Sequence, residues 1–164
     1  MYDSGGAPRG RHSTYLFQLQ QPTLLPEGAA LISEIIVEYM KTHGIACIGG
    51  LEMGAVPIVS AVAAASHLKN YPVDAFFVRK AQKEHGARER IDGFLPTGAP
   101  VLMIDDVATR GGSILKAIEG MEGHGCCVRR ALAVAEREEG AAQNLAAHDI
   151  HLAAIFKRSD FPGI

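Results

Sequence analysis

Residues 101–113 read VLMIDDVATRGGS, and this stretch decides the fold class. It begins with the apolar run Val101–Ile104, which predicts a buried strand. Two acids, Asp105 and Asp106, end the run, and a turn with two glycines leads to Ser113, where we expect a helix to begin. A strand that passes through a short turn into a helix is typical of α/β domains.

The rest of the chain repeats this alternation. Helical patterns cover residues 26–43, 56–68, 113–122 and 141–147, and apolar strand patterns cover residues 45–48, 73–78, 101–104, 128–134 and 152–156. Strands that are apolar along their whole length predict a parallel sheet covered on both faces. We therefore expect a single α/β domain over residues 1–164, with a mainly parallel central sheet flanked by helices. Its ligands should lie at the carboxyl ends of the strands.

Composition excludes several classes of protein. Of the 164 residues, 48% are hydrophobic and 21% are charged, which is unlike a disordered chain. The net charge of −2 argues against a nucleic-acid partner, and no apolar stretch is long enough to span a membrane. Three cysteines do not form a disulfide framework. These features predict a soluble, cytoplasmic protein without nucleic-acid or membrane partners.

The turn after the acid pair has the properties of an anion site. Backbone N–H groups around Gly111 and Gly112 would lie beside the positive end of a helix, and Thr109 and Ser113 add hydroxyl donors. Phosphate fits this arrangement. Two adjacent acids do not bind phosphate themselves, so hydroxyl groups, a developing positive charge or a divalent metal are their expected partners.

The motif differs from both common nucleotide-binding loops, because neither GxxxxGK[ST] nor an early GxGxxG is present. It resembles instead the phosphoribosyl diphosphate (PRPP) signature of type I phosphoribosyltransferases. The resemblance implies that residues 108–113 surround the 5′-phosphate and that the two acids hold the ribose hydroxyls. It assigns to PRPP the residues Asp105, Asp106, Val107, Ala108, Thr109, Arg110, Gly111, Gly112 and Ser113.

A second segment, residues 77–93, reads FVRKAQKEHGARERIDG and concentrates cations after an expected strand. Such a cluster suits a diphosphate. Arg79, Lys80, Lys83 and His85 match the R-K-x-x-K-x-H-G pattern of the mobile catalytic loop in orotate phosphoribosyltransferases. The resemblance implies that residues 80–93 form this loop and that Lys83 reaches the active site of a neighbouring subunit. It therefore implies a homodimer, with Lys83 and His85 joining the acid pair as catalytic residues.

Three further segments resemble the same family: residues 49–57, residues 135–140 and, at the N-terminus, residues 10–17. Residues 49–57, GGLEMGAVP, occupy the place of its diphosphate loop, which assigns Met53 and Gly54 to PRPP through backbone N–H groups. Residues 135–140, AEREEG, resemble a D-R-x-x-G motif, which places Arg137 against the orotate carboxylate. We expected Glu136, Glu138 and Glu139 in this segment to form a solvated turn.

The N-terminal segment, residues 10–17, reads GRHSTYLF and resembles the family's orotate-binding segment. It adds Leu16 and Phe17 to Thr109 and Arg137 as expected contacts to the base. Residues 1–18 would be a partial base-binding segment, without the helices that the family has upstream.

The resemblance implies transfer of the phosphoribosyl group of PRPP to orotate, which gives orotidine 5′-monophosphate and diphosphate in de novo pyrimidine synthesis. Mg²⁺ would be bound chiefly through PRPP, with no metal site built by the protein alone. Two alternatives remain: a phosphoribosyltransferase for another base, and a non-catalytic regulator that binds PRPP. The presence of Lys83 and His85 argues against the regulator.

Overall fold

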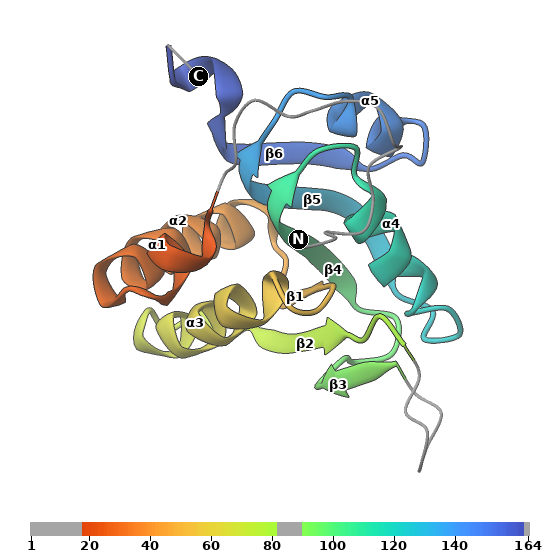
Figure 1. The fold of residues 1–164 in the computed structure, drawn as a ribbon. Coiled ribbons are helices and arrows are strands. Elements are labelled where there is room, and N and C mark those ends of the chain that lie inside the picture. The colour runs from red at the N-terminus through yellow and green to blue at the C-terminus, as the bar shows by residue number, and fades with distance from the viewer. Residues whose placement is uncertain (1–17, 82–89, 163–164) are drawn as a thin grey trace.

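The computed structural model describes residues 18–81 and 90–162, which form one sheet with helices on both faces (Figure 1). The helices of this part are α1 (Gln20–Leu24), α2 (Pro26–His43), α3 (Ala55–Leu68), α4 (Gly112–Glu119), α5 (Ala141–Ala146) and the 3₁₀ helix η1 (Arg158–Asp160). The strands are β1 (Cys47–Gly50), β2 (Asp74–Val78), β3 (Ile91–Gly93), β4 (Pro100–Ala108), β5 (Cys127–Glu136) and β6 (His151–Lys157). The predicted α/β class is confirmed.

The strand order is β3-β2-β1-β4-β5-β6, and every neighbouring pair is parallel except β2 and β3. β1 lies between β2 and β4. Along the chain, β2 and β3 are added on one side of β1, and β4, β5 and β6 are then added in turn on the other side. The loops after β1 and β4 consequently leave the sheet toward opposite faces. Such a reversal point at the carboxyl edge is where open parallel sheets bind their ligands.

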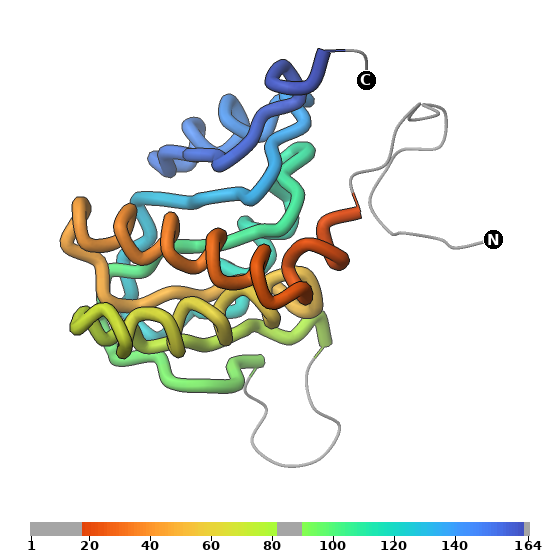
Figure 2. The backbone as a smooth tube through the Cα atoms, turned by 90° about the vertical axis from the view of Figure 1, so that its left-hand side faces the viewer, coloured from red at the N-terminus to blue at the C-terminus, as the bar shows by residue number. Residues whose placement is uncertain are grey.

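Two helical layers enclose the sheet. Helices α1, α2 and α3 cover one face, and α4 and α5 cover the other; Figure 2 shows α2 and α3 running side by side. β4 contributes to both layers because successive residues of a strand face opposite sides. Leu102 and Ile104 pack with α2 and α3, whereas Val101 and Met103 pack with α4 and α5. This two-sided burial is the reason that the strand is apolar along its length.

All five predicted strands differ somewhat from their predicted limits, and β1 and β4 differ most. β1 was expected over residues 45–48, but it includes Gly49 and Gly50. A Cβ on Gly49 would lie 2.1 Å from the Phe76 ring, and a Cβ on Gly50 would lie 2.4 Å from the carbonyl oxygen of Ile104. These glycines are therefore needed for close packing within the sheet, and they do not mark the loop that we predicted. β4 likewise continues to Ala108, because its ladder with β5 extends past the acids.

Three short elements have no clear signal in the sequence. They are α1, β3 and η1, which have five, three and three residues. β3 exists because residues 91–93 pair antiparallel with β2, a contact that local patterns do not reveal. Helix α4 also ends at Glu119, three residues before the predicted limit. Within the described part of the chain, no helix is both long and apolar enough to cross a membrane.

Candidate active site

The acid pair and the loop after β1 meet at the reversal point of the sheet. A Cβ added to Gly54 would lie 2.6 Å from both Cγ and Oδ1 of Asp106. The Asp106 carboxylate therefore lies against the backbone at the start of α3, and its Oδ1 accepts a hydrogen bond of 2.8 Å from the N–H of Val107. Met53, beside Gly54, is 66% exposed and follows a cis peptide bond. Two segments that are fifty residues apart in sequence are thus brought together.

Asp105 differs from its neighbour in its burial. It is 8% exposed, and burial raises its pKa well above the usual value of an aspartate. The negative charge of Asp106 and a side-chain hydrogen bond to Asp106 raise this pKa further, whereas the charge of Lys80 lowers it. These effects together favour the protonated form of the Asp105 carboxyl group. A protonated carboxyl group donates a hydrogen bond, which an ionised one does not.

The predicted anion site lies between β4 and α4. Gly111 has a φ of +75°, a left-handed conformation, and a Cβ there would lie 2.9 Å from Cγ of Leu145. A Cβ on Gly112, the first residue of α4, would have no atom within 4 Å, so there is open space beside the start of this helix. Asn144 fixes the turn from α5 by donating a hydrogen bond of 2.8 Å to the carbonyl oxygen of Arg110. The N-terminal end of α4 attracts negative charge.

The loop after β2 is tied to the loop after β1 by Glu52. Its Oε1 accepts a hydrogen bond of 2.8 Å from the backbone N–H of Lys80. The backbone N–H of Glu52 donates to the carbonyl oxygen of Val78 at 2.9 Å. Glu52 was not among the site residues predicted from the sequence. In the structure it fixes the backbone of Lys80, whose charge acts on Asp105.

Arg79 has partners across the β2–β3 hairpin. Its Nε donates to the carboxylate of Asp92, and its guanidinium lies 5.9 Å from the centroid of the Phe77 ring. Its backbone N–H donates to the carbonyl oxygen of Arg90 at 2.7 Å, and Nε of Arg90 donates back to the carbonyl oxygen of Arg79 at 3.0 Å. Arg79 therefore stabilises the base of the loop that residues 80–93 were predicted to form. A role for Arg79 in PRPP binding stays a prediction.

Arg137 lies next to the anion site. Its backbone N–H donates to the carbonyl oxygen of Ala108 at 2.9 Å, so it adjoins the residue that precedes Thr109. Its side chain is 15% exposed, and its Nη2 lies 2.7 Å from Oε1 of Glu139. The expectation of a solvated acidic turn is wrong for Glu136, which is 7% exposed because it lies within β5 between two neighbouring strands.

The remaining predicted site residues lie outside the described ranges. These are Leu16 and Phe17 in the N-terminal segment, and Lys83 and His85 in the cationic loop. Their assignments stay predictions. The structure brings together the acid pair, the Met53–Gly54 loop, Lys80, the Thr109–Ser113 turn and Arg137 at one edge of the sheet. It adds Glu52 and Asn144, which contact these residues across large sequence separations that no local motif reveals, and Glu139, which pairs with Arg137 within the same turn.

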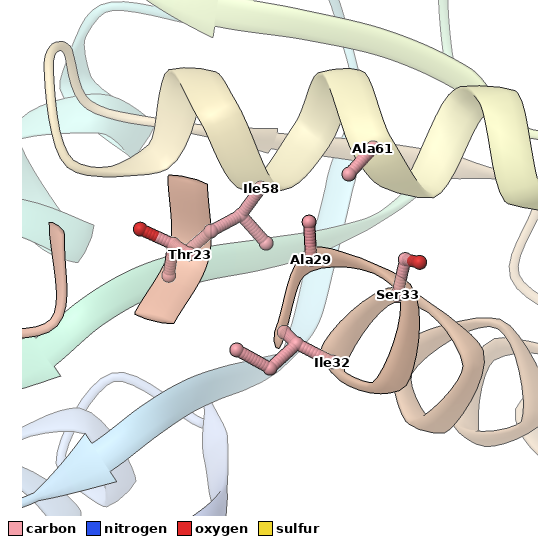
Figure 3. A pocket seen from close by; sticks show the side chains of 6 residues that line it. All are labelled: Thr23, Ala29, Ile32, Ser33, Ile58 and Ala61. Atoms are coloured by element: carbon pink, nitrogen blue, oxygen red, sulfur yellow. The ribbon is translucent and has the colours of Figure 1, made fainter. Parts of the chain in front are cut away.

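A small hollow lies between α1, α2 and α3 (Figure 3). Its two polar residues are already satisfied, since Thr23 donates to the carbonyl oxygen of Leu19 at 2.7 Å and Ser33 donates to that of Ala30 at 2.9 Å. Among the residues that the structure describes, no charged side chain lines it; the lining residues are Thr23, Ala29, Ile32, Ser33, Ile58 and Ala61. These six residues offer no group that could perform acid–base or phosphate chemistry.

The reversed parallel sheet, the acid pair and the helix-start anion site together define an α/β domain that binds a phosphorylated ligand with hydroxyl groups. Comparison with known proteins agrees. The family model described as "Phosphoribosyl transferase domain" matches residues 18–154. Orotate phosphoribosyltransferase from Rhodopseudomonas palustris (strain BisB18) is 44% identical over 156 residues, which cover 93% of this chain and 83% of that protein.

Two further relatives extend the comparison. Orotate phosphoribosyltransferase from Aquifex aeolicus is 38% identical over 92% of this chain and 82% of that protein. The crystal structure of the Mycobacterium tuberculosis enzyme in complex with PRPP is 32% identical, with a TM-score of 0.75 and coverage of 87% of this chain and 80% of that one. The chain belongs to the orotate phosphoribosyltransferase family, within the type I phosphoribosyltransferases.

Proposed function

We propose that this chain transfers the phosphoribosyl group of PRPP to orotate, forming orotidine 5′-monophosphate and diphosphate in pyrimidine biosynthesis. The observation that carries the proposal is the position of the Asp105–Asp106 pair. It lies between the Met53–Gly54 backbone and the start of α4, at the point where the strand order reverses. Carboxylates at this place suit ribose hydroxyls on one side, and the helix start suits a phosphate on the other.

The residues contribute mainly by positioning and by charge. Residues 108–113 hold the 5′-phosphate, and Asp106 accepts hydrogen bonds from the ribose hydroxyls. Asp105 becomes a second acceptor when it is ionised, a form that the positive charge of Lys80 favours. The negative charge of the pair then stabilises the positive charge that develops at the anomeric carbon as diphosphate departs. Lys80, held by Glu52, adds positive charge for the departing diphosphate.

Mg²⁺ fits the donor set of this edge. Asp105 and Asp106 offer carboxylate oxygens, and Mg²⁺ usually binds through one or two carboxylates together with substrate phosphates. Among residues 18–81 and 90–162, no group of three or more His, Cys, Asp or Glu side chains is arranged to hold a metal alone. Mg²⁺ would be held chiefly by the phosphates of PRPP, together with Asp105 and Asp106, and would supply positive charge to the diphosphate.

Arg137 is the proposed partner of the orotate carboxylate, with Thr109 beside it and Leu16 and Phe17 completing the base site. The test is turnover of PRPP against a panel of bases, with wild type and Arg137→Ala. Removing one partner of a buried charged pair costs on the order of 2–5 kcal/mol. The variant should therefore lose orotate turnover while its PRPP affinity changes little. Equal use of uracil or a purine by wild type would contradict the assigned base.

A homodimer is the proposed assembly. The support is the match of Lys83 and His85 to a family loop that acts in the neighbouring active site, together with the hairpin base that Arg79, Asp92 and Arg90 build for this loop. In this arrangement Lys83 closes over the diphosphate of the other subunit. His85 offsets charge on the leaving group or relays a proton.

A further inference from the structure

The turn that follows β5 is tied to the C-terminal turn η1 by the side chain of Glu138. Its Oε2 accepts a hydrogen bond of 2.9 Å from the backbone N–H of Ser159, and its Oε1 accepts one of 3.2 Å from the Ser159 hydroxyl. β5 and β6 are parallel, with Glu136 opposite Lys157, so both turns lie at the carboxyl edge of the sheet (Figure 1). The contact continues the link between the two strands beyond the end of their ladder.

Both sides of this contact have a defined conformation. Glu138 has a φ of +56°, in the left-handed region that residues with a Cβ seldom adopt. On the other side, η1 is closed by a hydrogen bond of 2.6 Å from the backbone N–H of Lys157 to Oδ2 of Asp160. A turn with its own internal hydrogen bond therefore presents the two donors of Ser159. An unusual backbone conformation that is held by specific contacts is a reasonable place to look for function.

Arg137 lies between two anchors as a result. On the β4 side, its backbone N–H is bound to the carbonyl oxygen of Ala108 at 2.9 Å. On the β6 side, the adjacent Glu138 is bound to Ser159. We propose that Glu138 and Ser159 form a clamp that positions Arg137 for the carboxylate of the base, which makes η1 part of the base-selecting site. This inference rests on the proposed function, in which Arg137 binds orotate.

The geometry of an arginine–carboxylate pair explains the need for a clamp. A guanidinium binds a carboxylate through two parallel hydrogen bonds, which tolerate little change in direction. Arg137 also has a competing carboxylate in its own turn, since Glu139 lies 2.7 Å from its Nη2. A turn anchored on both sides fixes where the guanidinium lies relative to this competitor. Without the clamp, the substrate carboxylate competes less well with Glu139 for the guanidinium of Arg137.

The experiment measures the KM for orotate and the KM for PRPP separately in the full chain. The variants are Glu138→Ala, Glu138→Gln and Ser159→Ala, and Glu122→Ala, an exposed acid beyond the end of α4, is the matched control. Because Glu138→Ala removes both acceptors, the KM for orotate should rise about three- to tenfold while the KM for PRPP stays constant. Glu138→Gln keeps an amide oxygen as acceptor and should recover most of the loss. The control should behave as wild type.

A further variant separates positioning from stability. Glu138→Gly removes the carboxylate but accepts the positive φ, which offsets the two lost hydrogen bonds, so it should unfold near the wild-type temperature and still lose affinity for orotate. Unchanged orotate KM in Glu138→Ala and Ser159→Ala would overturn the clamp, as would equal changes for orotate and PRPP. If Arg137→Ala also leaves the orotate KM unchanged, or wild type does not use orotate, the assignment of Arg137 is wrong and the clamp falls with it.

Discussion

Replacing Gly54 by alanine should damage the site and spare the fold. The new Cβ would lie 2.6 Å from Cγ and Oδ1 of Asp106 and 2.8 Å from its Oδ2. These three nearest atoms all belong to the short side chain of Asp106, and none belongs to the backbone. The Asp106 carboxylate can therefore move away without disturbing the sheet. Gly54 has a φ of −57° and a ψ of −38° at the start of α3, which alanine adopts readily.

The size of the displacement sets the expected effect. An ordinary contact to a Cβ begins at about 3.4 Å, so the carboxylate must move by about 0.8 Å. A hydrogen bond of normal length that is stretched by this amount is no longer a hydrogen bond. Losing hydrogen bonds to a charged group costs about 1.5–3 kcal/mol. The affinity for PRPP should therefore fall by about ten- to a hundredfold, while the midpoint of thermal unfolding stays near that of wild type.

Titration calorimetry with PRPP and Mg²⁺ measures the affinity, and thermal unfolding measures the stability. Gly50→Ala is the contrasting variant, because its Cβ would lie 2.4 Å from the backbone oxygen of Ile104 and 2.5 Å from the Cβ of Ala55. A backbone atom cannot move away as a side chain can, so the midpoint of thermal unfolding of this variant should fall strongly. Ser60→Ala, on the exposed side of α3, is the neutral control.

Wild-type affinity for PRPP in Gly54→Ala would refute the reasoning, because it would show that Asp106 does not hold PRPP from this position. A large loss of stability in the same variant would refute it differently. In that case the Asp106 carboxylate would be part of what stabilises the fold, and the separation of site from fold would be wrong.

Three further predictions follow from the charges and thiols of the chain. The pKa of Asp105 is raised in the folded protein, so above the usual aspartate range the folded state binds more protons than the unfolded state, and the free energy of unfolding falls as pH rises toward the raised pKa. Asp105→Asn should remove this pH dependence, as measured by urea unfolding, and should be more stable than wild type at neutral pH. Mixing inactive Lys83→Ala and Asp106→Asn chains should restore activity through hybrid dimers, and a monomer by light scattering with full activity would contradict a shared site. Burial raises the pKa of Cys47 to about 12, so alkylation near neutral pH should modify the exposed Cys127 first and Cys47 only on unfolding, as mass spectrometry would show.

The local sequence was sufficient for the order of the longer elements and for the candidate anion site. Pro26 at a helix start and Gly44 just past a helix end mark α2, whose predicted limits the structure confirms. The segment from Asp105 to Ser113 was recognisable because one continuous stretch carries its chemistry. Strand limits were harder to predict, as Gly49 and Gly50 show. A glycine that is needed because a phenylalanine ring packs against it cannot be distinguished, in sequence, from a glycine that a turn needs.

The contacts between segments were decided by the tertiary structure. Three contacts depend on the strand order, which brings together residues 21 to 52 positions apart. A Cβ on Gly54 would touch Asp106, Glu52 binds the backbone of Lys80, and Glu138 binds Ser159. The sequence by itself determined which residues are suited to binding phosphate, because that suitability follows from residue type and short spacing. Only the folded sheet decided which of them meet and how the Asp105 carboxyl group is charged, because distance, burial and the field of neighbouring charges arise when distant strands pair.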